Sequence, residues 1–201
     1  MLAATLIVKD EAATLPDCLA SLHGIVDEIV VYDTGSTDDT VTIARTAGAR
    51  VIQGYWDNDF ARARNAALDL TRADWILVID ADERLTGDTT ALRAYLQGDP
   101  AALLVLPVVN LGPEGQELQT LPSHRIARRA AVRWHGQVHE QLQPVAPHTA
   151  AAAVSAPLPL DVRVIHHGYA DAERRRLKAE RNLALAQAQL CLLYTSDAAD
   201  E

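Results

Sequence analysis

Cysteine is scarce in this chain of 201 residues, which contains only Cys18 and Cys191. Two isolated cysteines make no disulfide framework, so their scarcity favours a reducing compartment. Basic residues are also few, since 18 lysines and arginines stand against 27 aspartates and glutamates, and the net charge is −9. Because nucleic-acid phosphates select basic surfaces, this balance argues against nucleic-acid binding as the main activity.

Long apolar segments are missing as well. The first apolar run, Leu2–Val8, is too short to cross a membrane and lacks the basic leader and cleavage site of a secretory signal. We therefore expect no transmembrane segment and a cytoplasmic location, and peripheral membrane association stays open. The chain shows no internal repeat, and its length suits one α/β domain with a single core.

Strands and helices alternate in the first part of the chain. Apolar, β-branched runs predict strands, and leucines or alanines at helical intervals predict helices. This β-α-β-α-β order predicts a parallel sheet whose strands end at one common edge, where open α/β sheets bind ligands. The predicted strands are Leu2–Val8, Asp27–Tyr32, Arg50–Gln53 and Trp75–Ile79, and the helices run from Leu15 to near Gly24, from a cap at Ser36 or Thr37 to about Ala47, and over Phe60–Leu70.

The second part of the chain changes character. Turn residues between two apolar runs, at Gly112–Gly115, predict a hairpin and therefore a mixed or antiparallel sheet. The predicted elements are strands over Leu103–Asn110 and Leu118–Ala127, an irregular connection over 144–160, a strand over Asp161–Ile165 and a helix over Asp171–Leu190. The last eleven residues, Cys191–Glu201, resemble a translated sequencing adapter, so we expect the natural domain to cover 1–190.

Two carboxylates, Asp80 and Asp82, directly follow the predicted strand Trp75–Ile79. Oxygen ligands one residue apart at a strand end suit a hard divalent ion, Mg²⁺ or Mn²⁺, that also binds substrate phosphates. The alternative is a solvated acidic turn that caps the next helix.

Two further side chains are candidates for binding an anionic nucleotide. Asp33 leaves a buried strand at Asp33-Thr-Gly-Ser-Thr-Asp38, where ordinary turn chemistry is an equally good explanation. Arg64, in Phe60-Ala-Arg-Ala-Arg-Asn65, precedes the strand that delivers Asp80, and a guanidinium group suits phosphate oxygens. Arg62, in the same segment, fits a solvated helix face better.

These blocks, in this order and spacing, resemble the family 2 glycosyltransferases with the GT-A fold. The resemblance is to a bacterial branch whose members often continue into tetratricopeptide-type repeats. It extends over about residues 3 to 190 and implies a GT-A-type, Rossmann-like three-layer sandwich with a parallel N-terminal sheet. It is carried by Leu6-Ile-Val-Lys-Asp-Glu11, Val26-Asp-Glu-Ile-Val-Val-Tyr-Asp-Thr-Gly-Ser-Thr-Asp38, Trp56-Asp-Asn-Asp-Phe-Ala-Arg-Ala-Arg-Asn65, Asp74-Trp-Ile-Leu-Val-Ile-Asp-Ala-Asp-Glu83, Ser123-His-Arg-Ile-Ala-Arg128, Val132-Arg-Trp-His-Gly136, Val138-His-Glu-Gln141 and Ile165-His-His-Gly-Tyr169.

The resemblance implies a role for each candidate. Asp33 would contact the uridine of a UDP-sugar, and Arg64 would lie near its diphosphate. Asp80 would lie by the ribose or the metal, Asp82 would be the direct metal ligand, and His166 would be a further ligand. Glu140 would be the catalytic base that takes the proton from the attacking acceptor.

The implied reaction is an inverting displacement that transfers a sugar from a nucleotide diphosphate, with Mn²⁺ or Mg²⁺ as cofactor. The acceptor stays open among glycans, lipid-linked molecules, peptides and small molecules. In this interpretation residues 1–100 bind the donor, 101–170 face the acceptor and 171–190 form a helix leading onward. Two alternatives remain: a sugar-nucleotide nucleotidyltransferase, disfavoured because Thr5–Glu11 lacks the glycine-rich phosphate loop, and a non-catalytic interaction domain.

Overall fold

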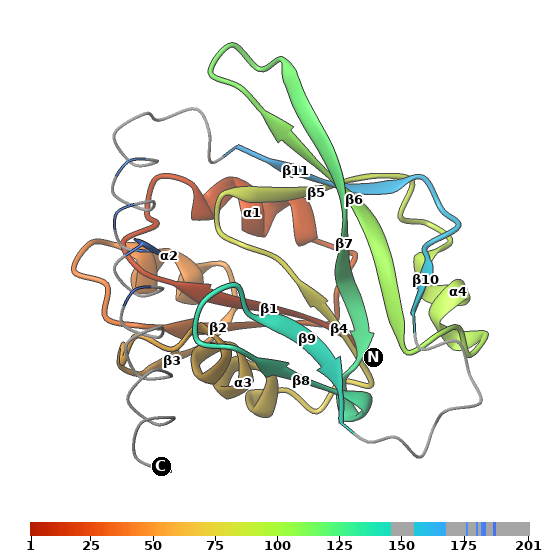
Figure 1. The fold of residues 1–201 in the computed structure, drawn as a ribbon, viewed down its shortest axis with the longest axis horizontal. Helices are drawn as coiled ribbons and strands as arrows, with labels where there is room; N and C mark the ends of the chain where they lie inside the picture. The colour runs from red at the N-terminus through yellow and green to blue at the C-terminus, as the bar shows by residue number, and fades with distance from the viewer. Residues whose placement is uncertain (146–154, 168–175, 177–179, 181, 184–186, 188–201) are drawn as a thin grey trace, which may run out of the picture.

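In the part of the chain that the structure describes, a mixed sheet of nine strands forms the centre of the fold (Figure 1). The computed structural model describes residues 1–145, 155–167, 176, 180, 182–183 and 187. Eight strands follow one another in the order β3-β2-β1-β4-β7-β6-β11-β5, and β10 pairs with β6. The strands are β1 (Leu2–Val8), β2 (Glu28–Asp33), β3 (Arg50–Gln53), β4 (Trp75–Val78), β5 (Glu83–Gly87), β6 (Leu103–Leu111), β7 (Glu117–Arg128), β10 (Ser155–Pro157) and β11 (Val162–His166).

The first four strands in this order are parallel, as the sequence predicts. β1 pairs with β2 on one side and β4 on the other, with Val8 opposite Asp33 and Thr5 opposite Val78. β1 and β4 are buried on both faces, which explains their nearly unbroken apolar sequences. Their carboxyl ends therefore meet at one edge of the sheet, and the acidic segments that follow β2 and β4 lie there.

The rest of the sheet is mixed. β7 pairs antiparallel with β4 and forms the predicted hairpin with β6, and Figure 1 shows the far end of this hairpin projecting beyond the other strands. β11 runs parallel to β6 and antiparallel to β5. The strand order of the sheet therefore ends at β5, which follows β4 in sequence but lies at the edge opposite to β3.

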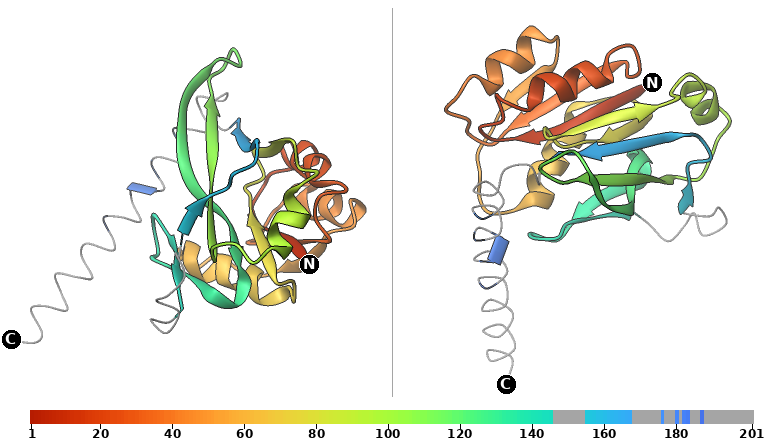
Figure 2. Two further views of the ribbon diagram at one scale, coloured as in Figure 1. Left: turned by 90° about the vertical axis from the view of Figure 1, so that its right-hand side faces the viewer. Right: turned by 90° about the horizontal axis from the view of Figure 1, so that it is seen from above.

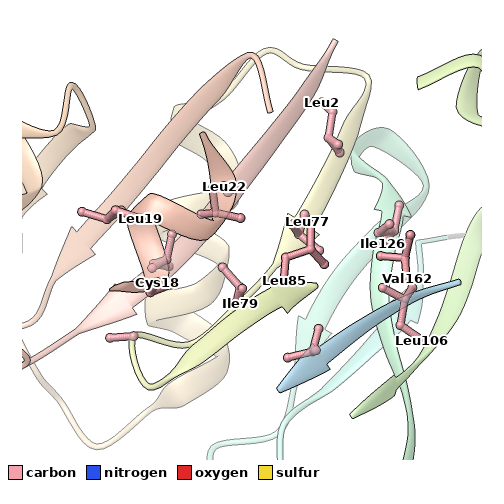
Figure 3. Close-up of a cluster of buried hydrophobic side chains, with 14 of the residues drawn as sticks. Leu2, Cys18, Leu19, Leu22, Leu77, Ile79, Leu85, Leu106, Ile126 and Val162 are labelled. Atoms are coloured by element: carbon pink, nitrogen blue, oxygen red, sulfur yellow. The ribbon is translucent and has the colours of Figure 1, made fainter. Parts of the chain in front are cut away.

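Helices and a small second sheet cover the two faces, which gives three layers (Figure 2). Side chains of β4 alternate, so that Leu77 packs in the cluster of α1 (Leu15–Leu22) and α2 (Thr40–Thr46), and Ile76 packs against α3 (Phe60–Leu70). Figure 3 shows Leu19 and Leu22 of α1 beside the sheet. The α3 face also holds η1 (Arg129–Ala131) and the two-stranded sheet of β8 (Val132–His135) and β9 (Gln141–Pro144), and α4 (Leu92–Gln97) packs in the α1 cluster.

Most predicted elements are present, with some corrections. The cap at Ser36 or Thr37 is wrong, because α2 begins at Thr40 and Asp39 precedes it, while Ser36 and Thr37 bond to other carboxylates. The segment 144–160 is not irregular throughout, since β10 pairs with β6. The sequence pattern did not predict β5, β8, β9 and α4, which are short.

The C-terminal prediction is covered only in part. Within the helix predicted over 171–190, the described residues are helical, and Arg176 pairs with Glu180 one turn later at 2.9 Å. The other residues of that helix and the expected adapter tail, 191–201, lie outside the described part of the chain. Among the described residues, no helix is both long and apolar enough to span a membrane.

Candidate active site

A pocket of about 290 Å³ opens at the carboxyl ends of β1 and β4. This is the edge at which α/β sheets bind ligands, and the loops after β1, β2 and β4 all reach it. Its lining combines apolar and aromatic side chains with a few charged groups, as is usual in small-molecule sites. The lining residues are Ile7, Val8, Lys9, Glu11, Thr34, Trp56, Phe60, Arg64, Asp80, Ala81, Asp82 and His166.

Asp82 and His166 come together from distant parts of the chain. β11 pairs antiparallel with β5 so that His166 lies opposite Glu83, next to Asp82. The His166 Nε2 atom lies 3.5 Å from Asp82 Oδ2, and the backbone N–H of His167 donates to the Asp82 carbonyl at 2.9 Å. Burial opposes the charged ring, but the hydrogen bond and charge of Asp82 outweigh it and raise the pKa of His166.

Arg64 connects two of the predicted acids. Its Nη2 donates to Asp80 Oδ1 at 3.0 Å and its Nε to Glu140 Oε1 at 2.7 Å. Its guanidinium carbon also lies 4.9 Å from the centre of the Trp134 ring. Burial alone would raise the pKa of Asp80, but Arg64, with help from Arg125, holds it below its usual range.

Glu140 is held behind Arg64 and does not itself line the pocket. It ends the loop between β8 and β9, in which Gly136 and His139 both adopt left-handed backbone conformations with φ of 95° and 56°. This tight loop aims Glu140 at α3, where Arg64 lies. The Oε1 atom of Glu140 therefore accepts the hydrogen bond from Arg64 Nε at 2.7 Å.

Asp33 is turned into its own loop. It is 1% exposed, and its carboxylate accepts hydrogen bonds from the backbone N–H of Gly35 and from the N–H and hydroxyl of Ser36. The pocket wall at this point is its neighbour Thr34. The turn chemistry weighed from the sequence is thus present, with Gly35 at φ of 112°, a conformation that favours glycine.

The loops after β1 and β2 are bonded to each other. Asp10 Oδ1 accepts from the Thr37 N–H at 2.7 Å, and Asp38 Oδ2 accepts from the Ala12 N–H at 3.0 Å. The buried Thr40 hydroxyl accepts from the Glu11 N–H at 2.7 Å. These bonds hold the pocket wall formed by the loop after β1 in a fixed position.

Three residues of the site were not singled out from the sequence. Glu83 is buried, and its Oε1 accepts from Arg125 Nη2 at 2.6 Å. Burial and the neighbouring Asp80 raise the pKa of Glu83 to about 7, against the lowering effect of Arg125. Asn110 faces His166 on the adjacent strand, with its Oδ1 2.8 Å from Nδ1. For Glu83, its position next to Asp80 and Asp82 in the sequence was a signal that could have placed it at the site.

The side chains around the pocket suit a divalent cation. Asp82 and His166 offer an oxygen and a nitrogen at adjacent positions, and Asp80 adds a carboxylate, one oxygen of which is held by Arg64. In the described part of the chain no three such groups are already gathered around one point. A small cation that keeps waters and binds phosphate oxygens needs only one or two protein carboxylates, so this donor set fits Mg²⁺ or Mn²⁺.

The fold and pocket define an α/β domain with a pocket at the carboxyl edge of a parallel sheet, beside paired aspartates. Residues 5–146 match the family model described as glycosyl transferase family 2. Since this match covers more than half of the chain, the protein belongs to glycosyl transferase family 2, as the sequence motifs indicated. Membership in this family sets the nucleotidyltransferase alternative aside.

Curated relatives extend the comparison. A TPR repeat-containing protein of Synechococcus elongatus is 38% identical over 185 residues, covering 88% of this chain and 44% of that protein. The SPbeta prophage-derived glycosyltransferase SunS of Bacillus subtilis is 29% identical over 194 residues, covering 93% of this chain and 44% of that protein. The chain thus spans less than half the length of these relatives, and the first of them fits the expected link to tetratricopeptide repeats.

Solved structures show the same fold. TarS residues 1–349 of S. aureus superimposes with a TM-score of 0.53 at 20% identity, covering 65% of this chain and 47% of that one. Glucosyl-3-phosphoglycerate synthase from Mycobacterium tuberculosis, in complex with Mn²⁺ and uridine-diphosphate-glucose, gives 0.50 at 22% identity, covering 68% and 60%. At these identities the likeness establishes the GT-A fold, which confirms the predicted fold class.

Proposed function

We propose that this chain is the catalytic domain of an inverting glycosyltransferase that takes a sugar from a nucleotide diphosphate with the help of a divalent metal. One observation carries the proposal: Arg64, Asp80, Asp82 and His166 all line one pocket at the carboxyl edge of the parallel sheet. Asp80 and Asp82 bring two carboxylates into this pocket beside His166, a donor set that suits a divalent cation.

The donor is proposed to be a UDP-sugar. Two structures with the same fold are complexes with UDP-GlcNAc and with uridine-diphosphate-glucose, respectively. In this chain the pocket offers Trp56 and Phe60, whose rings pack edge to face with centroids 4.8 Å apart, beside Thr34. Asp33, buried in the same loop as Thr34, is the proposed determinant of uridine binding, through the shape it imposes on that loop.

Asp82, Asp80 and His166 are the proposed holders of Mn²⁺ or Mg²⁺. When bound, such an ion neutralises the charge that develops on a departing diphosphate. Arg64 carries a further positive charge to the same wall of the pocket, and its two ion pairs keep it oriented before a ligand arrives. Preorganised charge of this kind stabilises a transition state without reorganisation during the reaction.

Glu140 is the proposed general base. In an inverting displacement the acceptor attacks the anomeric carbon from the face opposite to the leaving diphosphate, and a carboxylate must receive its proton. Arg64 holds Glu140 Oε1, and the second oxygen is the proposed proton acceptor. The acceptor is proposed to carry a hydroxyl or another nucleophilic group. It is a glycan, a lipid-linked molecule, a peptide or a small molecule.

The domain assignment follows from the same argument. We assign donor binding to residues 1–100 and the acceptor side to 101–170, although both parts contribute strands to one sheet. A helix over 171–190 leading to a further segment is supported by the repeat-containing relative. A cytoplasmic location is proposed from the scarcity of cysteine and is tested by fractionating the source cells.

The test is calorimetric titration of UDP and a panel of UDP-sugars into the protein, with Mn²⁺ or with a chelator. The proposal expects metal-dependent binding that Asp82→Ala abolishes. Asp69→Ala is the matched control, because Asp69 is an exposed carboxylate on α3 that pairs with Arg133 away from the pocket. No binding by the folded wild-type protein would instead support a non-catalytic domain. The anomeric configuration of the released sugar, read by NMR during slow donor hydrolysis, tests inversion.

A further inference from the structure

Glu83 closes the turn that carries the paired aspartates. Its backbone N–H donates to the Asp80 carbonyl at 3.0 Å, and its Oε2 accepts from the Asp80 N–H at 2.9 Å. The β4 ladder with β1 has already ended at Val78, so the Glu83 carboxylate accepts from that N–H in place of a neighbouring strand. Glu83 is thus hydrogen-bonded to both the backbone N–H and the carbonyl of Asp80, and these two bonds close the short segment from Asp80 to Asp82.

Arg125 anchors this turn to another strand. It lies on β7, 42 residues further along the chain, and its Nη2 donates to the second oxygen of Glu83 at 2.6 Å. The Glu83 side chain is buried, at 3% exposure, and the Arg125 side chain is 13% exposed. Among the described residues, Arg125 makes its only ion pair with Glu83.

Glu83 also connects to the strand that carries the third proposed ligand. It begins β5 and lies opposite His166 in the antiparallel pairing of β5 with β11. The backbone carbonyl of the neighbouring Asp82 accepts a hydrogen bond from the backbone N–H of His167 at 2.9 Å. A shift of Glu83 therefore moves the aspartate turn and changes its spacing from His166.

A buried ion pair is a poor device for stability alone, because desolvation of the two charges offsets their attraction. Replacement of both partners by apolar side chains of similar volume is often neutral for folding. Here the pair fixes the position of the Glu83 carboxylate, because that group accepts from Arg125 and from the Asp80 N–H at the same time. Groups that orient metal ligands in this way commonly control metal affinity by about 10- to 100-fold.

We infer that Glu83 and Arg125 are positioning residues that hold the Asp80–Asp82 turn in the geometry required to bind a divalent cation with a nucleoside diphosphate. This inference rests on the proposed function. Neither residue lines the pocket, so both act through the turn and not by contact with the ligand.

The experiment compares the wild-type chain with the double variant Glu83→Leu, Arg125→Met, which removes both charges together. Binding of UDP with Mn²⁺ is measured by calorimetry, binding of uridine by NMR, and folding by urea denaturation. The expected result is a folded double variant with UDP·Mn²⁺ affinity reduced about 10- to 100-fold and uridine affinity unchanged. Arg125→Lys, which keeps a charge for Glu83, is expected to fall between the double variant and the wild type.

Hydrogen exchange of the metal-free protein provides a second measurement, which does not depend on ligand binding. The Asp80 amide is expected to exchange more slowly in the wild type than in the double variant or Arg125→Met. Arg128→Met is the matched control, because Arg128 lies on the same strand and pairs with the exposed Asp99. It is expected to leave both the exchange rate and the UDP·Mn²⁺ affinity unchanged.

The outcomes separate this inference from the proposed function. A folded double variant that binds UDP·Mn²⁺ within twofold of the wild type overturns the positioning role while the proposed function stands. If the wild type itself binds no UDP·Mn²⁺, the proposed function fails and the positioning role fails with it. Should the double variant not fold, equal Asp80 exchange rates in Arg125→Met and the wild type would overturn the anchoring.

Discussion

At the scale of single residues, the site depends on buried charges that neutralise one another. Arg64 lies between Asp80 and Glu140, and Arg125 lies against Glu83. Glu140 and Glu83 have little access to water, whereas the Asp80 side chain is 37% exposed, so the loss of a guanidinium partner leaves mainly Glu140 or Glu83 uncompensated. The cost of such a loss is larger than the net contribution of the intact pair.

Arg64→Met is therefore expected to lower the free energy of unfolding by about 3 kcal/mol, the low end for a broken buried pair, because Glu140 loses its partner while water screens the partly exposed Asp80. Arg163→Met is the control, since Arg163 pairs with Asp161 in solvent and its loss should change stability little. Urea denaturation of both variants provides the comparison. Equal stability of the two would contradict the view that Arg64 is an essential partner of buried acids.

Glu140→Gln keeps the size of the side chain and an oxygen for Arg64, but it cannot accept a proton. Turnover of the donor is expected to fall by about 10²- to 10⁴-fold, the usual contribution of a general base. Binding of UDP is expected to stay within a few fold of the wild type. Turnover is measured as donor hydrolysis followed by mass spectrometry, and UDP binding is measured by calorimetry. Undiminished turnover would mean that another residue is the general base.

The raised pKa of Glu83 predicts a pH dependence of stability. Its pKa is about 7 in the folded protein and 4.5 ordinarily, so the folded state retains a proton that the unfolded state loses between these values. The contribution of Glu83 to stability is thus fully present below pH 4.5 and is lost as the pH rises to about 7.

Glu83→Gln, which does not titrate, is expected to remove this slope. Urea denaturation in chelator at several pH values should show the stability of the wild type falling relative to the variant between pH 4.5 and 7. Parallel curves in that window would mean that Glu83 has the same pKa in both states.

At the scale of elements, β5 is the unpredicted strand that matters most for the site. It is short, and its buried positions Glu83 and Leu85 alternate with the half-buried Arg84 and Thr86, so Leu85 is its one large apolar side chain. Its position at the sheet edge depends on pairing with β11, some 80 residues away in the chain, through contacts such as Gly87 with Val162. This pairing brings His166 beside the aspartate turn, so it links the fold directly to the site.

Gly87 is the residue at which this pairing is most sensitive to substitution. It has φ of 99°, and a Cβ atom there would lie 1.9 Å from the carbonyl oxygen of Asp161. Gly115, in the β6–β7 turn, has φ of 77° but open space around it. Gly115→Ala should cost about 1–2 kcal/mol from backbone strain alone, and Gly87→Ala clearly more, because the backbone of the β5–β11 pair must also move.

Thermal and urea denaturation of the two alanine variants measure this difference. Gly87→Ala should also weaken UDP·Mn²⁺ binding, since His166 belongs to the same strand pair. Similar losses of stability in both variants would show that the close approach of Asp161 is relaxed easily.

At the scale of the whole molecule, ligand binding and folding are linked. A ligand that binds only the folded state raises the free energy of unfolding by about 2.7 kcal/mol at a concentration 100 times its dissociation constant. For a chain of this size that corresponds to roughly 5–10 °C in melting temperature. Saturating UDP with Mn²⁺ should produce such an increase, chelator should remove it, and Asp82→Ala should not show it. An equal increase with and without metal would argue against a metal-assisted donor site.

Local sequence was sufficient for much of the architecture. The apolar runs of β1 and β4, the helical spacing in α3 and the turn at Gly112–Gly115 predicted these elements nearly at their observed bounds. The order of those elements predicted a parallel sheet with its carboxyl ends together, and therefore placed Asp80 and Asp82 at the pocket. These features depend on residues close together in the chain, whose side-chain periodicity is set by backbone geometry.

Tertiary structure alone decided which charges meet. Arg64 lies 76 residues from Glu140, and Glu83 lies 42 residues from Arg125, so neither pair has a sequence pattern that could predict it. The burial that raises the pKa of Glu83 likewise exists only once β5, β7 and β11 have assembled around it. The sequence by itself thus determined the family, the strands and the edge where the acids lie. Packing determined how those acids are paired and held, because ion-pair energies depend on distance and desolvation rather than on order along the chain.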